Sequence, residues 1–505
     1  MTNTNSRERL DGAKPAKDKT RIIVASHRLP WNCEWEKQAS HWKLTPRKGH
    51  SAQYSGTRSL SDLADVVISV GMVEPNIPND SSFGILKSVL WAQKQCVPVY
   101  IDPLLSLGHY EGYCKSELWP LFHYVLWDTA TDGKVETKNW NSYVEVQQRF
   151  ADAIWSMYQD GDKIWVQDYH LLLLPSMLRK ILPNAMIGYF LHTPFPSSEV
   201  FRCLPKRVEI LSGILASNLV GFQTFSHSRH FISSCTRVLG LESTLGGIDY
   251  HGLEVAVEIF PVGIDLGRVQ QFRTGKNVLE KIALFKSIYA GKKIIIGRDK
   301  LDLTKGLIHK LASFEHFLQL YPNWKDKVVL VQVTESTKGK VTNIKISEMV
   351  SRINGIYGGL EFIPIHHHDT EKLCSEDYYA LLSIADVALV TSTRDGMNTT
   401  SHEFIVCQQE RKGALILSEF TGSAGALSGA LLVNPWDHVD VAHVINDALT
   451  MSLEERTIKH SVFFKKLTLA IVPACFEQFC FILGTQFHYG TKIEIGNART
   501  AQCDP

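Results

Sequence analysis

The chain has 505 residues, which is too many for one hydrophobic core and predicts two or three domains. Hydrophobic residues make up 44% of it and charged residues 21%, as in a soluble globular protein, and a net charge of +1 argues against nucleic acid or a membrane surface as partners. The ten cysteines are scattered and form no CxxC pair, which predicts reduced thiols. No apolar run reaches transmembrane length and the start has no signal-peptide core, so we expect a cytoplasmic protein.

After a polar segment, 1–20, that we expect to be a disordered tail, the first half alternates short apolar runs with segments of helical spacing. This alternation predicts a parallel sheet covered by helices. Its expected strands are 21–28, 66–70, 97–101, 163–170, 187–192, 218–223 and 257–265. Ligands bind at the carboxyl ends of such strands, where this chain places Arg28, Asp168 and His192.

The alternation restarts after Asp265 and predicts a second domain of the same kind. Its expected strands are 292–297, 328–333, 360–365, 385–390, 415–422 and 431–435. We therefore predict an α/β protein with two doubly wound, Rossmann-like domains, 21–265 and 266–455, whose ligand ends face a cleft. A crossover helix at 456–490, with its apolar part at 462–483, returns to the first domain, and a tail follows at 491–505.

Two motifs resemble metal sites, and we interpret both as structural. Asp160-Gly161-Asp162 is a DxD sequence, but it precedes the strand at 163–170 and so lies at the end of the sheet where ligands do not bind. The tract His366-His367-His368 has no cysteine or acidic partner at ligand spacing, which favours a polar loop. We expect no metal site in this chain.

The decapeptide 394–403 is the strongest candidate for a ligand site, because it joins an apolar strand to a helix. Gly396 lets the backbone approach a ligand, and the N–H groups of 397–400 face an anion at the helix N-terminus. Asp395 and Glu403 stand on either side, which suits a nucleotide-sugar: one carboxylate for the sugar hydroxyls and one for the ribose. The alternative is an ordinary strand–helix turn with a capping Asn or Thr.

Three cations, Arg298, Lys300 and Lys305, follow the strand at 292–297. Cations that converge at a strand end suit a diphosphate, since it gains negative charge when it leaves. Together with the decapeptide, they predict a phosphorylated or nucleotide ligand on the second domain.

An ordered set of motifs resembles the trehalose-6-phosphate synthase family, retaining glycosyltransferases of family 20 with the two-Rossmann (GT-B) architecture. The set runs from about residue 21 to 487 and comprises HYEGY, ELWPLFHY, WVQDYHLL, FLHTPFP, GFQT, FPVGID, KLDLTKGL, RINGIYG, RDGMN with Glu403, and LVNPWD. The resemblance implies transfer of glucose from UDP-glucose to glucose 6-phosphate, giving trehalose 6-phosphate and UDP, without a metal or other cofactor. The implied partner chains are a second copy or other trehalose-synthesis subunits.

The resemblance also implies roles for residues. Asp168, His192 and Asp395 would be catalytic, with Asp168 on the acceptor hydroxyls and His192 on the donor sugar. The implied donor-binding residues are Lys300, Lys305, Asp395, Gly396, Met397, Asn398, Thr399, Thr400 and Glu403. The implied acceptor-binding residues are Arg28, Gly49, Tyr110, Asp168 and Lys338.

Several positions depart from the family pattern. His50 replaces the second Gly of a Gly-Gly pair, Val70 falls where a Trp is usual, and Lys300 and Lys338 replace Arg, which removes a bidentate fork. RDKLD and DGMNTTSHEF are closer to the synthase-like domain of fungal trehalose-phosphate phosphatases and to regulatory subunits. Two hypotheses stay open, an active synthase and a catalytically weak or inactive synthase-like subunit; a third, a related transferase with another acceptor, is disfavoured by HYEGY and LWPLFHY.

Overall fold

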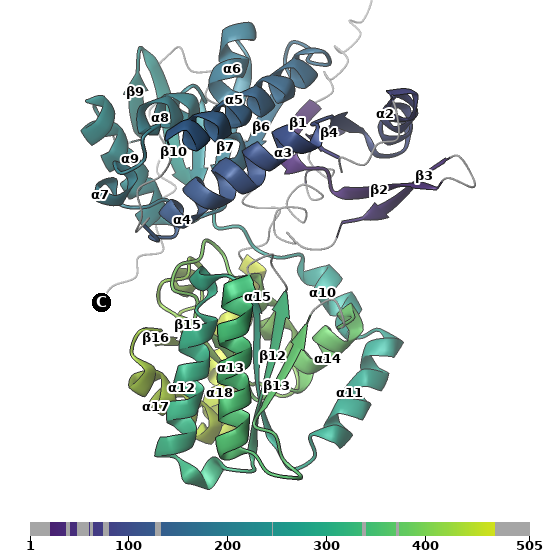
Figure 1. The fold of residues 1–505 in the computed structure, drawn as a ribbon, viewed down its shortest axis with the longest axis vertical. Helices are drawn as coiled ribbons and strands as arrows, with labels where there is room; N and C mark the ends of the chain where they lie inside the picture. Colours follow the sequence, from purple (N-terminus) through teal and green to yellow (C-terminus); the bar gives the residue numbers. More distant parts are fainter. Residues whose placement is uncertain are drawn as a thin grey trace, which may run out of the picture.

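The structure is a computed structural model that describes residues 21–36, 41–47, 60, 64–73, 80–126, 133–244, 246–335, 340–369 and 373–469. These residues form two α/β domains, drawn one above the other in Figure 1. The predicted tails, 1–20 and 491–505, lie outside the described residues, as does most of the predicted crossover helix.

The first domain is built on an eight-stranded sheet with the order β5-β4-β1-β6-β7-β8-β10-β9. Its strands are β1 (Arg21–Arg28), β4 (Val66–Met72), β5 (Cys96–Val99), β6 (Lys163–Gln167), β7 (Met186–Leu191), β8 (Leu219–Phe222), β9 (Gly247–Tyr250) and β10 (Leu253–Ile259). The first seven in the sheet order are parallel, as predicted, whereas the edge strand β9 pairs antiparallel with β10 and was not predicted. The strand order reverses between β1 and β6, which makes their carboxyl ends the ligand end of the sheet.

Two elements of the first domain were missed. One is the antiparallel hairpin of β2 (Trp31–Glu36) and β3 (His41–Pro46). The other is a continuous helical run of α3 (Pro103–Ser106), η2 (Leu107–Leu118) and α4 (Trp119–Phe122), for which the sequence pattern predicted no element. This run packs along α5 (Gly133–Trp155), and contacts with that long helix outweigh the weak local signal.

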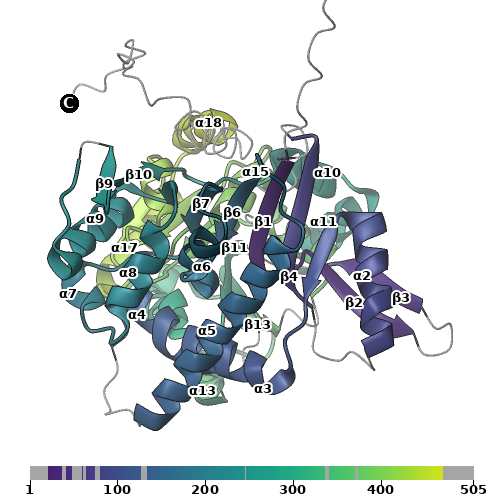
Figure 2. The same ribbon diagram turned by 90° about the horizontal axis from the view of Figure 1, so that it is seen from above.

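The other described helices of the first domain lie mostly against one face of its sheet, as Figure 2 shows from above, and α2 packs on the edge strand β5. They are α2 (Asp80–Lys94), η3 (Tyr169–Leu171), α6 (Leu174–Ile181), α7 (Ser198–Phe201), α8 (Arg207–Leu215) and α9 (Phe225–Leu239). Between these layers lies a core rich in aromatic side chains, among them Phe122, Tyr143 and Phe195.

The second domain has a six-stranded parallel sheet with the order β13-β12-β11-β14-β15-β16. Its strands are β11 (Lys293–Lys300), β12 (Val328–Glu335), β13 (Ile365–Asp369), β14 (Val387–Val390), β15 (Ala414–Ser418) and β16 (Leu431–Val433). The order reverses between β11 and β14, so the strand end before the decapeptide lies at the switch point. The described helices are α10 (Leu266–Arg273), α11 (Lys276–Ile288), η4 (Leu303–Lys305), α12 (Leu307–Leu320), η5 (Pro322–Trp324), α13 (Lys340–Tyr357), α14 (Ser375–Ile384), α15 (Thr399–Cys407), α16 (Ser423–Ala426), α17 (His438–Thr450) and α18 (Leu453–Leu469).

Two predictions in the second domain were wrong. The strand predicted at 360–365 begins only at Ile365, and the histidine tract is part of it rather than a loop. His366 lies 3.1 Å from the hydroxyl of Tyr289, at the end of α11, and His367 lies 2.7 Å from that of Thr334, on β12, so both rings have hydrogen-bonding partners. The alternation of a strand places successive histidines on opposite faces, which a loop prediction cannot do.

The last described helix, α18, begins at Leu453, nine residues before the predicted apolar helix at 462. Its side chains Phe463 and Leu467 are buried in the core of the second domain. The predicted return to the first domain falls on residues outside the described part, and it stays a prediction.

Candidate active site

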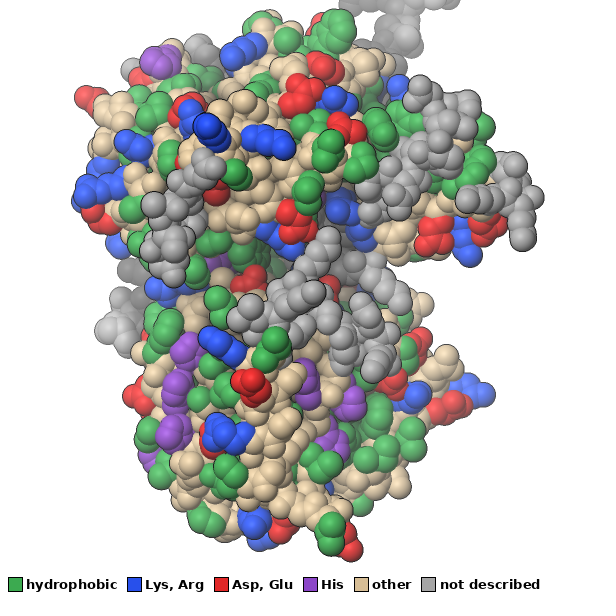
Figure 3. All heavy atoms as spheres, viewed as in Figure 1, with side chains coloured by type: hydrophobic (Ala, Val, Ile, Leu, Met, Phe, Trp, Pro, Cys, Tyr) green, Lys and Arg blue, Asp and Glu red, His purple; other side chains and the backbone are tan. Residues whose placement is uncertain are grey.

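The ligand ends of the two sheets face each other, and direct contacts join the domains there. Trp119 Nε1 donates a hydrogen bond of 2.9 Å to Asp302 Oδ2 across the interface. Met397 packs against buried apolar residues of both domains, including Val24 and Phe190 of the first. The surface is indented where the two halves meet (Figure 3), and a cavity between them is lined by residues of both domains, among them Tyr124 and Arg394.

Gly396 supplies the closest of these interdomain contacts. A Cβ atom at this position would lie 2.0 Å from the carbonyl oxygen of His192, a distance no real side chain tolerates. Gly422 is equally constrained, because its Cβ would lie 1.9 Å from the Gly396 carbonyl. We had explained Gly396 by the close approach of a ligand; the structure explains it by the close approach of the other domain.

Asp168 follows β6 in a strained backbone conformation, with φ 70° and ψ 172°. Its carboxylate accepts a hydrogen bond of 3.3 Å from the His192 N–H and further bonds from the N–H groups of Tyr169 and Thr193. Burial raises the pKa of Asp168 to about 6, and these N–H donors oppose that rise. The carboxylate is thus held in one orientation by backbone groups.

His192 follows β7 beside Asp168, so the two predicted catalytic residues of the first domain are neighbours. Its Nε2 lies 2.6 Å from Gln167 Oε1, and its side chain is half-buried at the cleft. The Gln167 amide therefore orients the imidazole ring.

Arg28 and Tyr110 also lie together, as the predicted acceptor phosphate site requires. The guanidinium carbon of Arg28 is 5.9 Å from the centroid of the Tyr110 ring, and Lys115 Nζ is 5.1 Å from the same centroid. Tyr110 stacks on His27, which stacks on His170 at a centroid distance of 4.3 Å. A column of rings thus supports the two cations at the end of β1.

The acceptor-side departures divide into two groups. Gly49, His50 and Lys338 lie outside the described residues. Val70 is fully buried inside β4, where it pairs with Ala25 and Val97 in the middle of the sheet. We had placed Val70 on the acceptor wall, and this was wrong, because its side chain belongs to the core.

On the second domain, Lys305 Nζ and Asp395 Oδ1 form an ion pair of 3.0 Å. Gly306 follows Lys305 with φ 65° and begins α12; a Cβ there would lie 1.8 Å from the Thr391 carbonyl oxygen. Only glycine fits this turn, which brings Lys305 to the decapeptide. Asn398 Nδ2 lies 3.3 Å from Asp395 Oδ2, so the carboxylate is held on both oxygens.

The decapeptide is both a capped turn and a potential anion site. Asn398 is the N-cap of α15, since its Oδ1 accepts a hydrogen bond of 2.9 Å from the Ser401 N–H. The Asn398 N–H donates to Ser423 Oγ at 2.9 Å, so it is not available to a ligand as we had predicted. Thr399 and Thr400 are the first helical residues, and N–H groups there have no carbonyl partner within a helix.

The three predicted cations do not converge on one point. Lys305 is paired with Asp395, while Arg298 Nη1 lies 3.9 Å from Glu403 Oε2. Lys300 is exposed at the end of β11. Glu403 is buried and accepts a hydrogen bond of 2.8 Å from the Tyr378 hydroxyl, so two carboxylates at the two ends of the decapeptide are each matched by a cation.

The DxD sequence, which resembles a metal motif and which we interpret as a turn, is held by structural contacts. Asp162 accepts from the Gln159 N–H at 2.9 Å and pairs with Arg21 at 3.0 Å, and Gly161 has φ 92°, as expected of the predicted turn. Within the described ranges, no group of three or more His, Cys, Asp or Glu side chains is placed to hold a metal ion.

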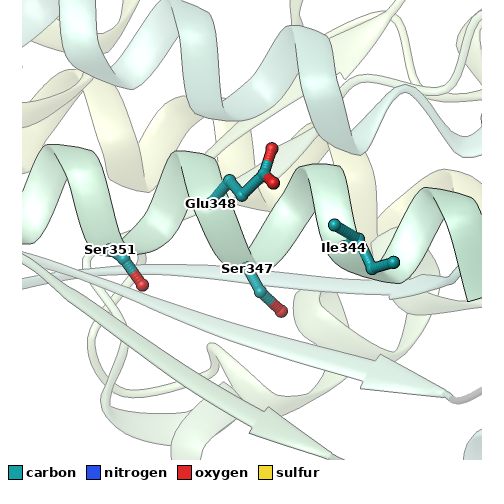
Figure 4. A pocket seen from close by; sticks show the side chains of 4 residues that line it. All are labelled: Ile344, Ser347, Glu348 and Ser351. Atoms are coloured by element: carbon teal, nitrogen blue, oxygen red, sulfur yellow. The ribbon is translucent and has the colours of Figure 1, made fainter.

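Two cavities are present, and one of them borders these polar clusters, because Asp302, Gly306 and Arg394 line it. One, of about 340 Å³, is lined by residues of both domains, including Tyr124, Leu307, Arg394 and Trp436. The other, of about 410 Å³, is an open depression along one face of α13, where Ile344, Ser347, Glu348 and Ser351 stand in a row (Figure 4). Neither is lined by Lys305, Asp395 or Glu403, so the candidate site is defined by the side chains at the sheet switch points.

Sequence reasoning missed Trp119, Asp302 and Tyr378. Trp119 and Asp302 both stand in motifs that we quoted, ELWPLFHY and KLDLTKGL, but nothing in one sequence shows that they meet. Tyr378 carried no signal, because its contact with Glu403 depends on how α14 packs against α15.

Two Rossmann-like domains that face each other across such a cleft define the GT-B class of glycosyltransferase folds. A family model described as "Glycosyltransferase family 20" matches residues 20–473, and the chain belongs to this family.

Among curated relatives, the chain is 41% identical over 453 residues to "Alpha,alpha-trehalose-phosphate synthase [UDP-forming] A" of Dictyostelium discoideum, covering 89% of this chain and 60% of that protein. It is 45% identical over 457 residues to the UDP-forming alpha,alpha-trehalose-phosphate synthase of Yarrowia lipolytica, covering 88% and 95%. The chain thus spans nearly the whole length of one relative and less than two thirds of the other.

Among solved structures, the N-terminal domain of Candida albicans trehalose-6-phosphate phosphatase superimposes with a TM-score of 0.86 and 39% identity, covering 94% of this chain and 99% of that one. A trehalose-6-phosphate protein of E. coli bound with UDP-2-fluoro glucose superimposes with a TM-score of 0.80 and 26% identity, covering 92% and 99%. In the part of the chain that the structure describes, no helix is long and apolar enough to cross a membrane.

Proposed function

We propose that the chain transfers glucose from UDP-glucose to glucose 6-phosphate and releases trehalose 6-phosphate and UDP. The observation that supports this most is the donor-side cluster: Lys305 paired with Asp395 at 3.0 Å, next to the N-terminus of α15 and, about one turn into that helix, Glu403. The names of the relatives, which are UDP-forming synthases, point to the same reaction.

The leaving diphosphate gains negative charge as the glycosidic bond breaks. Lys305 and the N–H groups of Thr399 and Thr400 would stabilise that charge, and Asp395 would hold the sugar. Across the cleft, His192 would contact the donor sugar and Asp168 the acceptor hydroxyls, with Arg28 and Tyr110 on the acceptor phosphate. Because retaining enzymes of this kind have no obvious enzymic nucleophile, catalysis rests on positioning and charge stabilisation, and the leaving phosphate takes the proton of the incoming hydroxyl on the same face.

A second candidate function is a synthase-like domain with weak or no turnover. It is favoured by the similarity to the Candida albicans phosphatase N-terminal domain and by Lys300 and Lys338, which keep a charge but lack the bidentate fork of Arg. Such a domain would act with a second copy or with other subunits of trehalose synthesis.

A coupled assay of UDP release from UDP-glucose, with and without glucose 6-phosphate, separates the two. An active synthase gives release that depends on the acceptor, whereas the second candidate binds UDP without turnover. Light scattering then measures whether the chain is a monomer or self-associates.

The transfer should need no divalent metal. Cationic side chains stand at the donor site, and the DxD sequence lies at the opposite end of its strand. EDTA is therefore expected to leave UDP binding and release unchanged; a loss that magnesium or manganese restores would contradict this.

A further inference from the structure

Tyr378 and Arg298 both contact Glu403, the second acid of the decapeptide, and the three residues come from three different elements. The Tyr378 hydroxyl, on α14, donates a hydrogen bond of 2.8 Å to Glu403 Oε2, on α15. The guanidinium of Arg298, on β11, lies 3.9 Å from the same oxygen and covers the Tyr378 ring at 4.5 Å from its centroid. The group therefore joins the strand beside the switch point to both helices that follow it.

Within this group, the Glu403 side chain is buried and the Arg298 side chain is partly exposed to solvent. Only 6% of the Glu403 side chain is exposed, against 32% of the Arg298 side chain. A buried carboxylate without partners is unstable as an ion, and burial raises the pKa of Glu403. Arg298 opposes this rise most, followed by Tyr378, Arg268 and Tyr379.

The same contacts set the direction of the carboxylate. A Tyr hydroxyl both donates and accepts, and here the Thr400 hydroxyl bonds to Tyr378, which in turn bonds to Oε2 of Glu403. Tyr379 also hydrogen-bonds to the Glu403 carboxylate, so two neighbouring tyrosines fix its orientation, and its remaining lone pairs are the ones that a ligand can use. Two adjacent ribose hydroxyls are the partners that suit an oriented carboxylate of this kind.

We propose that Tyr378 and Arg298 are positioning residues that orient Glu403 toward the ribose hydroxyls of the donor nucleotide and thereby set a preference for ribonucleotides over 2′-deoxyribonucleotides. The proposal rests on the proposed function, because it takes the second domain to bind a nucleoside diphosphate. It assigns a role to two residues that do not themselves need to touch the sugar being transferred.

The test is calorimetric binding of UDP and of 2′-deoxy-UDP to the unmodified full chain and to Tyr378→Phe. UDP should bind the unmodified chain more tightly than 2′-deoxy-UDP. Tyr378→Phe should weaken UDP binding by about five- to tenfold, less than the loss of a direct hydrogen bond to a charged group because Glu403 itself remains, and should weaken 2′-deoxy-UDP binding by less, since that ligand offers only its 3′-hydroxyl. The two affinities should then differ by less than about threefold, by the same reasoning.

The pH profile of binding provides a readout that a merely structural role would not change. The ionised form of Glu403 accepts from ribose, so UDP affinity is present above the pKa of this acid and falls below it. Loss of the Tyr378 bond raises that pKa further, so the fall should begin at a higher pH in Tyr378→Phe. Arg298→Lys, which keeps the charge but not the planar stacking, should shift the profile in the same direction and by less.

Tyr289→Phe is the matched control, because this buried tyrosine belongs to the same hydrophobic core but its hydroxyl bonds to His366 of β13. It should leave both affinities and the pH profile unchanged. If Tyr378→Phe lowers the melting temperature but keeps the sugar preference and the pH profile, Tyr378 is structural. This proposal is then overturned, whereas the proposed function stands. If the unmodified chain does not bind UDP, the proposed function and this proposal are both overturned.

Discussion

The two walls of the cleft are organised by different forces. On the second domain, acids are matched by cations: Asp395 by Lys305 and Glu403 by Arg298. On the first domain, Asp168 is held by backbone N–H groups in a strained conformation, and Arg28 lies over the Tyr110 ring. Substitutions on the second domain should therefore act through charge, whereas those on the first should act through geometry.

The contact that joins the two walls should give the largest effect. Gly396→Ala places a Cβ against the His192 carbonyl, where only backbone movement can relieve the clash. A displacement of about 1 Å at the reacting centre costs about 100-fold in rate, so UDP release with acceptor should fall by about that factor. UDP affinity should change much less, because the donor cluster lies on one domain.

Gly425→Ala is the control for this substitution, since a Cβ at Gly425 meets no heavy atom within 4 Å. It should keep normal turnover. Normal turnover in Gly396→Ala would show that this contact does not set the geometry of the cleft.

Asp168→Asn tests the wall that depends on geometry. The amide fits the same space but does not accept on both sides, so turnover should fall by about 10²-fold, within the range for a positioned acid–base group, with UDP affinity unchanged. Burial raises the pKa of Asp168 from 3.8 to about 6, so the ionised form is disfavoured in the folded state and Asp168→Asn should be no less stable at pH 7.

For the unmodified chain, the same pKa predicts that turnover falls as the pH drops through about 6, because the ionised carboxylate is lost there. A pH–rate profile checks this. A profile identical in shape for Asp168→Asn and the unmodified chain would rule out Asp168 as its source.

Glu403→Ala tests the wall that depends on charge. It removes a charge-assisted hydrogen bond to the ribose and should weaken UDP binding by roughly 1–3 kcal/mol, measured by calorimetry. Tight binding that survives this substitution would contradict the ribose assignment.

Lys300→Arg should have the smallest effect. Lys300 is exposed at the end of β11, where a pair with diphosphate oxygens is screened by water, and both residues carry one positive charge. We expect UDP affinity to change by less than about 1 kcal/mol. A larger gain would show that the fork of Arg matters here and would strengthen the case for a weakened synthase.

The sequence alone determined most of the parallel strands. A strand that is buried on both faces needs a continuous apolar run, and such a run can be recognised without knowing its neighbours. It also placed Lys305 and Asp395, which follow β11 and β14, at the same edge of the sheet, where the structure pairs them. The antiparallel edge β9 and the helical run at 103–122 escaped prediction, because a single edge pairing and a long neighbouring helix decide them rather than local residue pattern.

Only the tertiary structure decided which residues meet across the domains and between helices. Gly396 follows a strand in the second domain, yet the reason for glycine there is a carbonyl oxygen 204 residues earlier, at His192. Tyr378 and Arg298 reach Glu403 from α14 and β11, and His367 reaches Thr334 across neighbouring strands. Local periodicity reports which side of an element is buried, whereas these contacts depend on how elements far apart in the chain pack against each other.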